Sequence, residues 1–78
     1  MKWYKIIIKE NNEELYLHYR RSKGFYWGMD TFATLFLKEH TIYDEKLVSF
    51  LNNYDYIIEE CTVFYSYHSY MKYHGKTI

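Results

Sequence analysis

Two short segments near the start of the chain alternate between apolar and polar side chains, and an asparagine pair lies between them. In residues 3–9, Ile6 and Ile8 share one parity with a tyrosine, while two lysines share the other. Residues 15–21 alternate in the same way. Period-two alternation is typical of strands that bury one face, and the pair Asn11–Asn12 tolerates the positive φ values of a tight turn. The sequence therefore predicts an opening β-hairpin. Ile7, which interrupts the alternation, is expected to face a partner.

Further along the chain the pattern predicts a short aromatic strand, 25–28, after a turn at residues 22–24. Residues 30–37 are ambiguous. Asp30 or Thr31 can cap one helical turn that runs through Ala33, and residues 34–37 can equally form a strand. We favour one turn followed by a short strand. A last long strand is predicted over residues 56–65. The tail, 66–78, is expected to extend that strand, form a short helix or fray.

One amphipathic helix is predicted over residues 42–53. Its apolar side chains recur at the spacing of one helical face, namely Tyr43, Leu47, Phe50, Leu51 and Tyr54. Thr41 and Asp44 have the spacing of a capping box, with Thr41 as the cap. The pair Asn52–Asn53 is expected to end the helix in the left-handed conformation.

The order of these elements predicts an α+β fold, a small and mainly antiparallel sheet with one main helix packed on one face. A chain of 78 residues is one domain at most, so residues 1–78 are expected to form a single domain. A single helix covers one face of the sheet. Aromatic residues make up 23% of the chain, 11 of them Tyr, which is more than so small a core needs. We therefore expect some rings on the other face, where they would meet a partner or a second copy.

The composition excludes several classes of protein. A single Cys excludes a disulfide scaffold, and a net charge of zero excludes a strongly basic DNA-binding arm and an acidic mimic of nucleic acid. The charge is nonetheless uneven: residues 1–24 carry six positive and three negative side chains, and residues 25–60 carry two positive and seven negative. These two regions either form internal ion pairs or make a bipolar surface that steers a partner.

Neither catalysis nor a cofactor is indicated, because the chain has no P-loop, nucleophile elbow or zinc-protease motif. The least improbable activity is a histidine-based RNase using His18 or His68. No metal site is expected either, since the available ligands have no zinc-finger spacing: His18, His40, Cys61, His68 and His74. We expect Cys61 to be a small reduced core residue of a cytoplasmic protein. No segment is apolar for long enough to be a signal peptide or a membrane span, and no membrane partner is expected.

The basic run 18–23 combines cations with a tyrosine, and such a combination can grip phosphates and stack a base. Nucleic-acid or nucleotide binding is therefore an alternative function, although the paired aromatic motifs of common RNA-binding sheets are missing.

One arrangement of residues is similar to that of known proteins. The opening hairpin is followed by Trp27, Asp30 and an Ala-x-x-Phe segment, Ala33–Phe36, and then by a helix and an acidic strand, 57–60. In this order the chain resembles small uncharacterised α+β proteins encoded by phages and prophages. The resemblance covers about residues 3–62 and implies structural roles for Trp27, Ala33 and Phe36. The class includes inhibitors of host defence such as anti-CRISPR proteins, so the resemblance implies a host protein or ribonucleoprotein complex as the target.

We therefore expect a phage-type, non-enzymatic inhibitor in the host cytoplasm that binds and occludes a host protein. Aromatic residues and Arg commonly carry interface energy, and the candidate anchors are Tyr19, Arg20, Arg21, Tyr65, Tyr67 and Tyr70. Each has a plainer reading: Tyr19 and Tyr65 as core residues, the arginines as solvated charges, and the last two tyrosines as part of a frayed tail. A homo-oligomer that uses residues 61–71 as an edge is a third reading.

Overall fold

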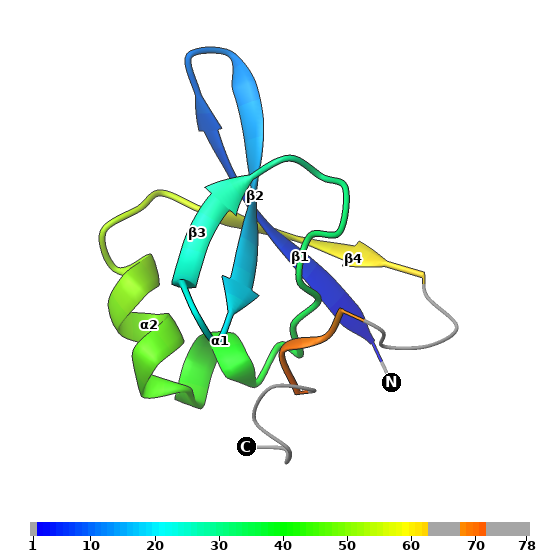
Figure 1. Cartoon of the computed structure of the whole chain (residues 1–78), viewed down its shortest axis with the longest axis vertical. Helices are drawn as coiled ribbons and strands as arrows, with labels where there is room; N and C mark the ends of the chain where they lie inside the picture. Colours follow the sequence, from blue (N-terminus) through cyan, green and yellow to red (C-terminus); the bar gives the residue numbers. More distant parts are fainter. Residues whose placement is uncertain (1, 63–67, 72–78) are drawn as a thin grey trace.

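The computed structural model describes residues 2–62 and 68–71. Its sheet has four strands in the spatial order β3-β2-β1-β4, and all neighbouring strands run antiparallel. Two short helices lie between the third and fourth strands in sequence (Figure 1). The elements are β1 (Trp3–Glu10), β2 (Glu13–Arg20), β3 (Gly24–Gly28), α1 (His40–Tyr43), α2 (Glu45–Leu51) and β4 (Ile57–Cys61). The predicted α+β class, with a small antiparallel sheet and one main helix, is confirmed.

The β1–β2 hairpin closes as the sequence predicts. Asn11 has φ 53° and Asn12 has φ 67°, the two positive values that a two-residue hairpin turn of type I′ requires. Glu10 pairs with Glu13 directly beside this turn. Asn adopts the left-handed region at little cost, so local chemistry fixes the register of the hairpin.

Ile7 does not face a partner, and that expectation is wrong. Its side chain is fully buried, as is that of Ile6, and Ile8 on its other side is buried as well. The reason is that β1 is an inner strand: Ile7 has Tyr16 opposite it on β2 and Ile57 opposite it on β4. A strand with neighbours on both sides can bury consecutive residues on both of its faces.

The main core lies between one face of the sheet and α2. It is formed by fully or almost fully buried side chains from five parts of the chain: Ile6, Leu17, Phe36, Leu47, Leu51 and Tyr70. A smaller cluster of Trp3, Leu35 and Leu37 extends it, with Cys61 and Met71 packed against it. The expectation that Cys61 is a small core residue is close to what is seen, since it is partly buried.

Residues 34–36 connect the two ends of the chain. The backbone of Phe36 makes two hydrogen bonds with that of Tyr4, each of 2.9 Å. The Leu35 amide donates to the His68 carbonyl at 2.9 Å, and the Tyr70 amide donates to the Leu35 carbonyl at 2.7 Å. Before this segment the chain makes a tight turn in which Phe32 has φ 60°, so the predicted helical turn is wrong, and the predicted strand consists only of isolated bridges.

The predicted helix, 42–53, is divided in two at Asp44. Asp44 has an extended backbone with φ −78° and ψ 109°, and its side chain accepts a hydrogen bond from the Leu47 amide at 3.0 Å. Asp44 is thus the N-cap of α2, whereas Thr41 lies inside α1 and donates its hydroxyl to the Lys38 carbonyl. The prediction of Thr41 as the cap is wrong, because Asp44 satisfies an orphan amide three residues later and starts a second helix there.

The far end of α2 and the last strand also differ from the predictions. Asn52 is right-handed with φ −59°, and Asn53 does not have a positive φ, so the left-handed stop is absent. Of the predicted face, Leu47 and Leu51 are buried, while Tyr43 and Tyr54 are exposed. β4 ends at Cys61, and residues 63–65 of its predicted extension lie outside the described residues. Within the described part of the chain, neither helix has the length and apolarity needed to cross a bilayer.

Candidate functional site

The face of the sheet opposite α2 carries a mixture of aromatic, basic and acidic side chains. We call this surface the open face. It follows from the strand registers and contains Lys5, Ile7, Tyr16, His18, Tyr26, Ile57 and Glu59. The aromatic residues that the sequence predicts beyond the reach of a single helix are therefore present on it.

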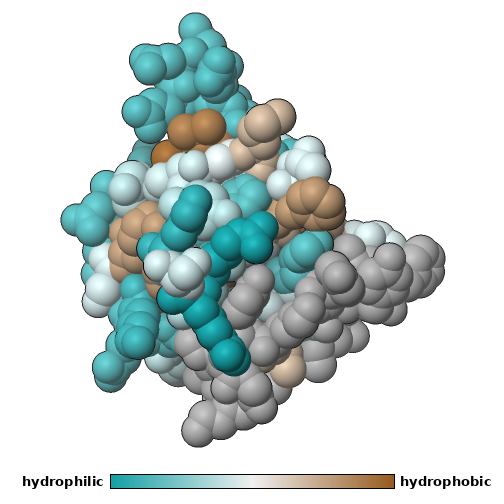
Figure 2. Space-filling model, in the orientation of Figure 1, coloured by the Kyte–Doolittle hydropathy of each residue, from teal (hydrophilic) through white to brown (hydrophobic). Residues whose placement is uncertain are grey.

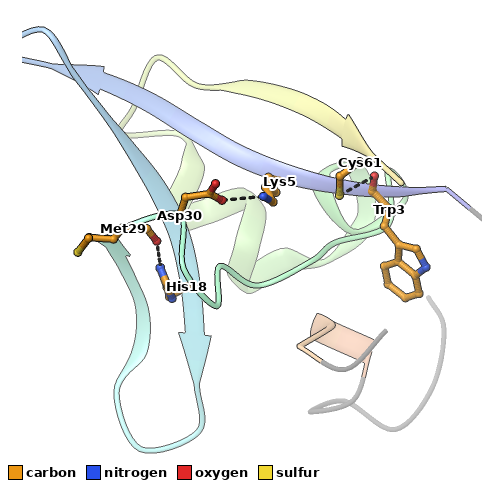
Figure 3. A network of polar contacts seen from close by, with 6 residues as sticks. All are labelled: Trp3, Lys5, His18, Met29, Asp30 and Cys61. Atoms are coloured by element: carbon orange, nitrogen blue, oxygen red, sulfur yellow. Dashed lines mark hydrogen bonds and ion pairs between the residues drawn. The ribbon is translucent and has the colours of Figure 1, made fainter. Parts of the chain in front are cut away.

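Lys5 and Tyr16 lie together near the middle of the open face. The Lys5 ammonium is 5.6 Å from the centre of the Tyr16 ring and forms an ion pair of 2.6 Å with Asp30 (Figure 3). The hydrogen bond to Asp30 raises the pKa of Lys5 and outweighs burial, which lowers it. Burial raises the pKa of Tyr16, and three nearby carboxylates act in the same direction, those of Asp30, Glu14 and Glu59. The ring of Tyr16 thus lies in a mixed electrostatic environment rather than a basic one.

The His18 imidazole, on the same face of β2 as Tyr16, is held in a fixed position by two contacts. It stacks on the Tyr26 ring with centroids 5.1 Å apart and an angle of 16°, and its Nε2 lies 2.6 Å from the Met29 carbonyl oxygen. A carbonyl only accepts, so Nε2 carries the proton and donates. A Cβ on Gly28 would lie 3.2 Å from both Cδ2 and Nε2 of His18. The absence of a side chain at Gly28 therefore makes room for the imidazole.

Two basic side chains at the end of the β2–β3 hairpin also contact Tyr26. Arg20 Nε donates to the Tyr26 hydroxyl at 3.1 Å, and the Lys23 ammonium is 5.4 Å from the centre of its ring. Arg20 and Arg21 are exposed. The predicted basic run is thus a surface in which cations and one aromatic ring are in contact.

Residues 29–32 form a turn that leaves β3 and crosses to β1, and it presents two large apolar side chains to solvent. Met29 is 77% exposed and Phe32 is 63% exposed. Phe32 has φ 60°, in the left-handed region, where a bulky residue is a genuine outlier. The turn is closed by the Ala33 amide, which donates to the Asp30 carbonyl at 2.9 Å, and it is tied to the sheet through Lys5. We call residues 29–32 the Met29–Phe32 turn.

The structure divides the predicted anchors. Arg20 and Arg21 are accessible, as an interface needs. Tyr19 is partly buried, with its ring 4.9 Å from that of Phe25 and 5.0 Å from that of Tyr70. Tyr70 is fully buried, so its prediction as a contact residue is wrong: backbone pairing with Leu35 carries its ring into the main core. Tyr65 and Tyr67 lie outside the described residues.

Burial has a strong effect on the buried tyrosine and on the cysteine. Desolvation, and then the nearby Asp44 carboxylate, raise the pKa of Tyr70 far above that of a free tyrosine. Burial also raises the pKa of the Cys61 thiol, which lies 3.5 Å from the Trp3 carbonyl oxygen. A raised pKa keeps this thiol protonated at neutral pH and makes it a poor nucleophile.

The uneven charge of the chain is partly compensated internally. Both ion pairs found among the described residues join the basic first region to the acidic middle region: Lys5 with Asp30 at 2.6 Å and Lys2 with Glu60 at 3.9 Å. The described residues contain no group of three side chains suited to hold a metal, and His74 lies outside them. Figure 2 shows hydrophilic side chains over the tip of the β1–β2 hairpin and separate apolar patches below it.

No protein-family model, curated protein or solved structure matches the chain. The function must therefore be argued from the site itself. Sequence reasoning missed Met29 and Phe32, although one signal was available. Met29 lies directly before the turn predicted at the start of residues 30–37, and Phe32 lies within it. Turns lie at the surface, so two large apolar side chains there have no obvious place in a core.

Proposed function

We propose that this chain is a phage-type inhibitor that binds and occludes a host protein without catalysing a reaction, and that it acts against a host defence such as CRISPR. The observation that carries the proposal is the Met29–Phe32 turn, with Met29 77% and Phe32 63% exposed. The resemblance to small phage proteins supports the class of inhibitor. The turn supports a protein target.

Two features of the turn support this role. Met and aromatic side chains are enriched in the centres of protein interfaces, where partner atoms replace the water around them. In addition, Phe32 holds a backbone conformation that costs roughly 1–3 kcal/mol for such a residue, and strain of this kind is concentrated at binding sites. A Gly at position 32 would remove both the strain and the exposed ring. The Phe32 ring contacts that of His68, with centroids 5.0 Å apart, and the rest of it is left for contact with a partner.

The open face favours a protein over a nucleic acid as the partner. Burial, and then the carboxylates of Asp30, Glu14 and Glu59, raise the pKa of Tyr16, and the chain has no net charge. Nucleic-acid affinity depends on cations that neutralise phosphates, and carboxylates beside the central ring oppose it. A mixed surface is typical of the polar rim of a protein interface.

Photo-crosslinking tests the proposal directly. Benzoylphenylalanine is placed at position 32 in one variant and at position 43 in another, since Tyr43 is exposed to a similar extent, 65%, on α1. After ultraviolet irradiation of bacterial cells that express each variant, position 32 is expected to give a discrete adduct with one host protein, and position 43 is expected to give much less of it. Equal labelling at both positions, or none at position 32, would contradict the proposal.

An infection assay tests the anti-defence role. In a host with active CRISPR immunity, the wild-type chain is expected to raise the plating efficiency of a targeted phage. The variant Phe32→Gly, expressed at the same level, is expected to lose that effect. The same comparison in hosts with other defences distinguishes CRISPR inhibition from inhibition of another system.

Nucleic-acid binding is the second candidate, and one observation favours it: two cations contact the partly buried Tyr26, Arg20 at its hydroxyl and Lys23 over its ring. Fluorescence anisotropy with a labelled oligonucleotide at two salt concentrations separates the two functions. Binding that weakens steeply with salt supports the second candidate. No binding at low salt eliminates it.

A further inference from the structure

β4 is an edge of the sheet with an accessible, mostly acidic surface. It is the last strand in the order β3-β2-β1-β4, and among the described residues it pairs only with β1. Ile57 is 55% exposed, and Glu59 and Glu60 are exposed as well. An edge strand has unpaired backbone groups along one side that can accept another strand.

A groove lies on the open face at the start of β4, where β1 extends past it. It is lined by Ile7, Lys9, Asp55 and Ile57. Ile57 is 55% exposed and gives the groove an accessible apolar side chain, whereas Ile7 is fully buried. The groove therefore offers an apolar contact at the end of β4 where an antiparallel segment would finish.

The charges along the edge are not satisfied internally. Within residues 2–62 and 68–71, neither Asp55 nor Glu59 makes an ion pair. Lys5 lies opposite Glu59 in the sheet, but its ammonium is paired with Asp30. Glu60 has only the long contact to Lys2, at 3.9 Å between two largely exposed side chains.

β1 provides a template for what β4 accepts. Opposite Ile57 and Ile58 it has Ile7 and Ile6, and opposite Glu59 it has Lys5. Cross-strand pairs of apolar with apolar and basic with acidic side chains stabilise a sheet, whereas like charges directly opposite destabilise it. The free side of β4 has the same preferences at Ile57, Ile58 and Glu59. At Glu60, where β1 has Tyr4, the largely exposed carboxylate favours a basic residue.

From these observations we propose that the free edge of β4 binds an extended segment of a partner protein, antiparallel to β4, in which two basic residues precede two apolar residues. The basic residues lie against Glu59 and Glu60, and the apolar residues lie against Ile57 and Ile58. A second copy of β4 is a poor occupant, because pairing centred on the strand would set the two Glu59 side chains opposite each other. This surface is distinct from the Met29–Phe32 turn, and the inference does not rest on the proposed function.

A peptide titration followed by two-dimensional amide NMR tests the inference. The probe is a capped hexapeptide, Thr-Lys-Lys-Val-Val-Thr. Two matched controls are the same peptide with Glu in place of both Lys, and the same peptide with N-methylated Val residues that cannot donate backbone hydrogen bonds. The probe is expected to shift the amide signals of residues 57–61 and to slow their exchange with solvent, and both controls are expected to bind at least fivefold more weakly.

A variant of the protein completes the test. Glu59→Gln with Glu60→Gln neutralises the two exposed carboxylates against which the basic residues lie, and is expected to weaken binding of the probe at least fivefold, with the difference decreasing at high salt. Dispersion of the amide spectrum shows that the variant is folded. No shift at β4 with millimolar probe, equal binding of the acidic peptide, or self-association through residues 57–61 would each overturn the inference. Because crosslinking at position 32 reports on a different surface, failure of one proposal leaves the other to its own test.

Discussion

The Lys5 ammonium lies 2.6 Å from Oδ1 of Asp30, so the centre of β1 is connected directly to the turn that carries Met29 and Phe32. A second contact, from His18 Nε2 to the Met29 carbonyl oxygen, holds the beginning of the same turn. The turn is therefore positioned by two side chains of the open face, although it lies outside the regular sheet.

Gly28→Ala is expected to disturb the position of His18. The new Cβ would lie 3.2 Å from two ring atoms of His18, so the imidazole would have to move by a few tenths of an ångström, which its hydrogen bond with Met29 and its stacking on Tyr26 oppose. We expect a loss of about 1–2 kcal/mol in the free energy of unfolding, as for other overpacked or broken contacts. Urea denaturation measures this loss.

A double-mutant cycle identifies the cause. In a His18→Ala background the same Gly28→Ala change should be neutral or slightly stabilising, because replacing Gly by Ala without a clash lowers the conformational entropy of the unfolded chain. An equal loss in both backgrounds would show that the two residues act independently.

The backbone of Phe32 supplies a second prediction. At φ 60°, Phe32→Gly is expected to be more stable than Phe32→Ala by about 1 kcal/mol, because only Gly occupies this region without steric cost. Both variants lose the ring contact with His68, so the comparison isolates the backbone. Thermal unfolding of the two purified variants provides the measurement, and equal midpoints would argue against strain at this residue.

Stability is expected to fall at alkaline pH. The pKa values of Lys5, Cys61 and Tyr70 are all raised in the folded protein, by the Asp30 hydrogen bond in the first case and by burial in the other two. Each group then holds its proton more tightly when folded. Its contribution is complete below the pKa of the unfolded chain, about 8.5 for Cys and 10–10.4 for Tyr and Lys, and is lost as the pH rises above that value.

The variant Tyr70→Phe tests the largest of these contributions. The free energy of unfolding of the wild type should decrease between about pH 9 and 11, and the decrease should be shallower for Tyr70→Phe. Tyr43→Phe, at an exposed position, should follow the wild-type curve. If the Tyr70→Phe and wild-type curves are parallel, burial of the hydroxyl does not govern the response.

The double variant Arg20→Ala with Arg21→Ala tests the predicted anchors that remain accessible. Both arginines are exposed, so the fold should be retained, while binding to the target should weaken by more than tenfold as hot-spot arginines are lost. Lys46→Ala, which removes an exposed charge from α2, is the matched control. The affinity for the crosslinked host protein measures the effect, and unchanged binding by the folded double variant would place the β2–β3 hairpin outside the interface.

The features that could be predicted from sequence are those set by neighbouring residues. The first hairpin follows from alternation and from Asn11–Asn12, and β3 follows from a turn next to an aromatic run. The apolar spacing predicts the helix in the right region. However, an Asp that caps a second helix, as Asp44 does, has the same sequence signature as an Asp in the first turn of a single helix. Local patterns thus gave the elements and missed the break between α1 and α2.

The features that could not be predicted depend on contacts between distant parts of the chain. The burial of Ile7 depends on β4 lying beside β1, some fifty residues away in sequence. The burial of Tyr70 depends on backbone hydrogen bonds to Leu35. Nothing in the residues next to Ile7 or Tyr70 encodes these neighbours, so the local pattern predicts a contact surface at each of the two residues.

The place of Tyr70 in the main core has a consequence during synthesis. The ring completes a cluster whose other members lie between residues 6 and 51, and it is fully enclosed there. A ribosome must therefore release residue 70 before the cluster can close, although the first hairpin can form as soon as it emerges. Until residue 70 is released, the nascent polypeptide exposes apolar surface. Chaperones and proteases have access to that surface during this interval.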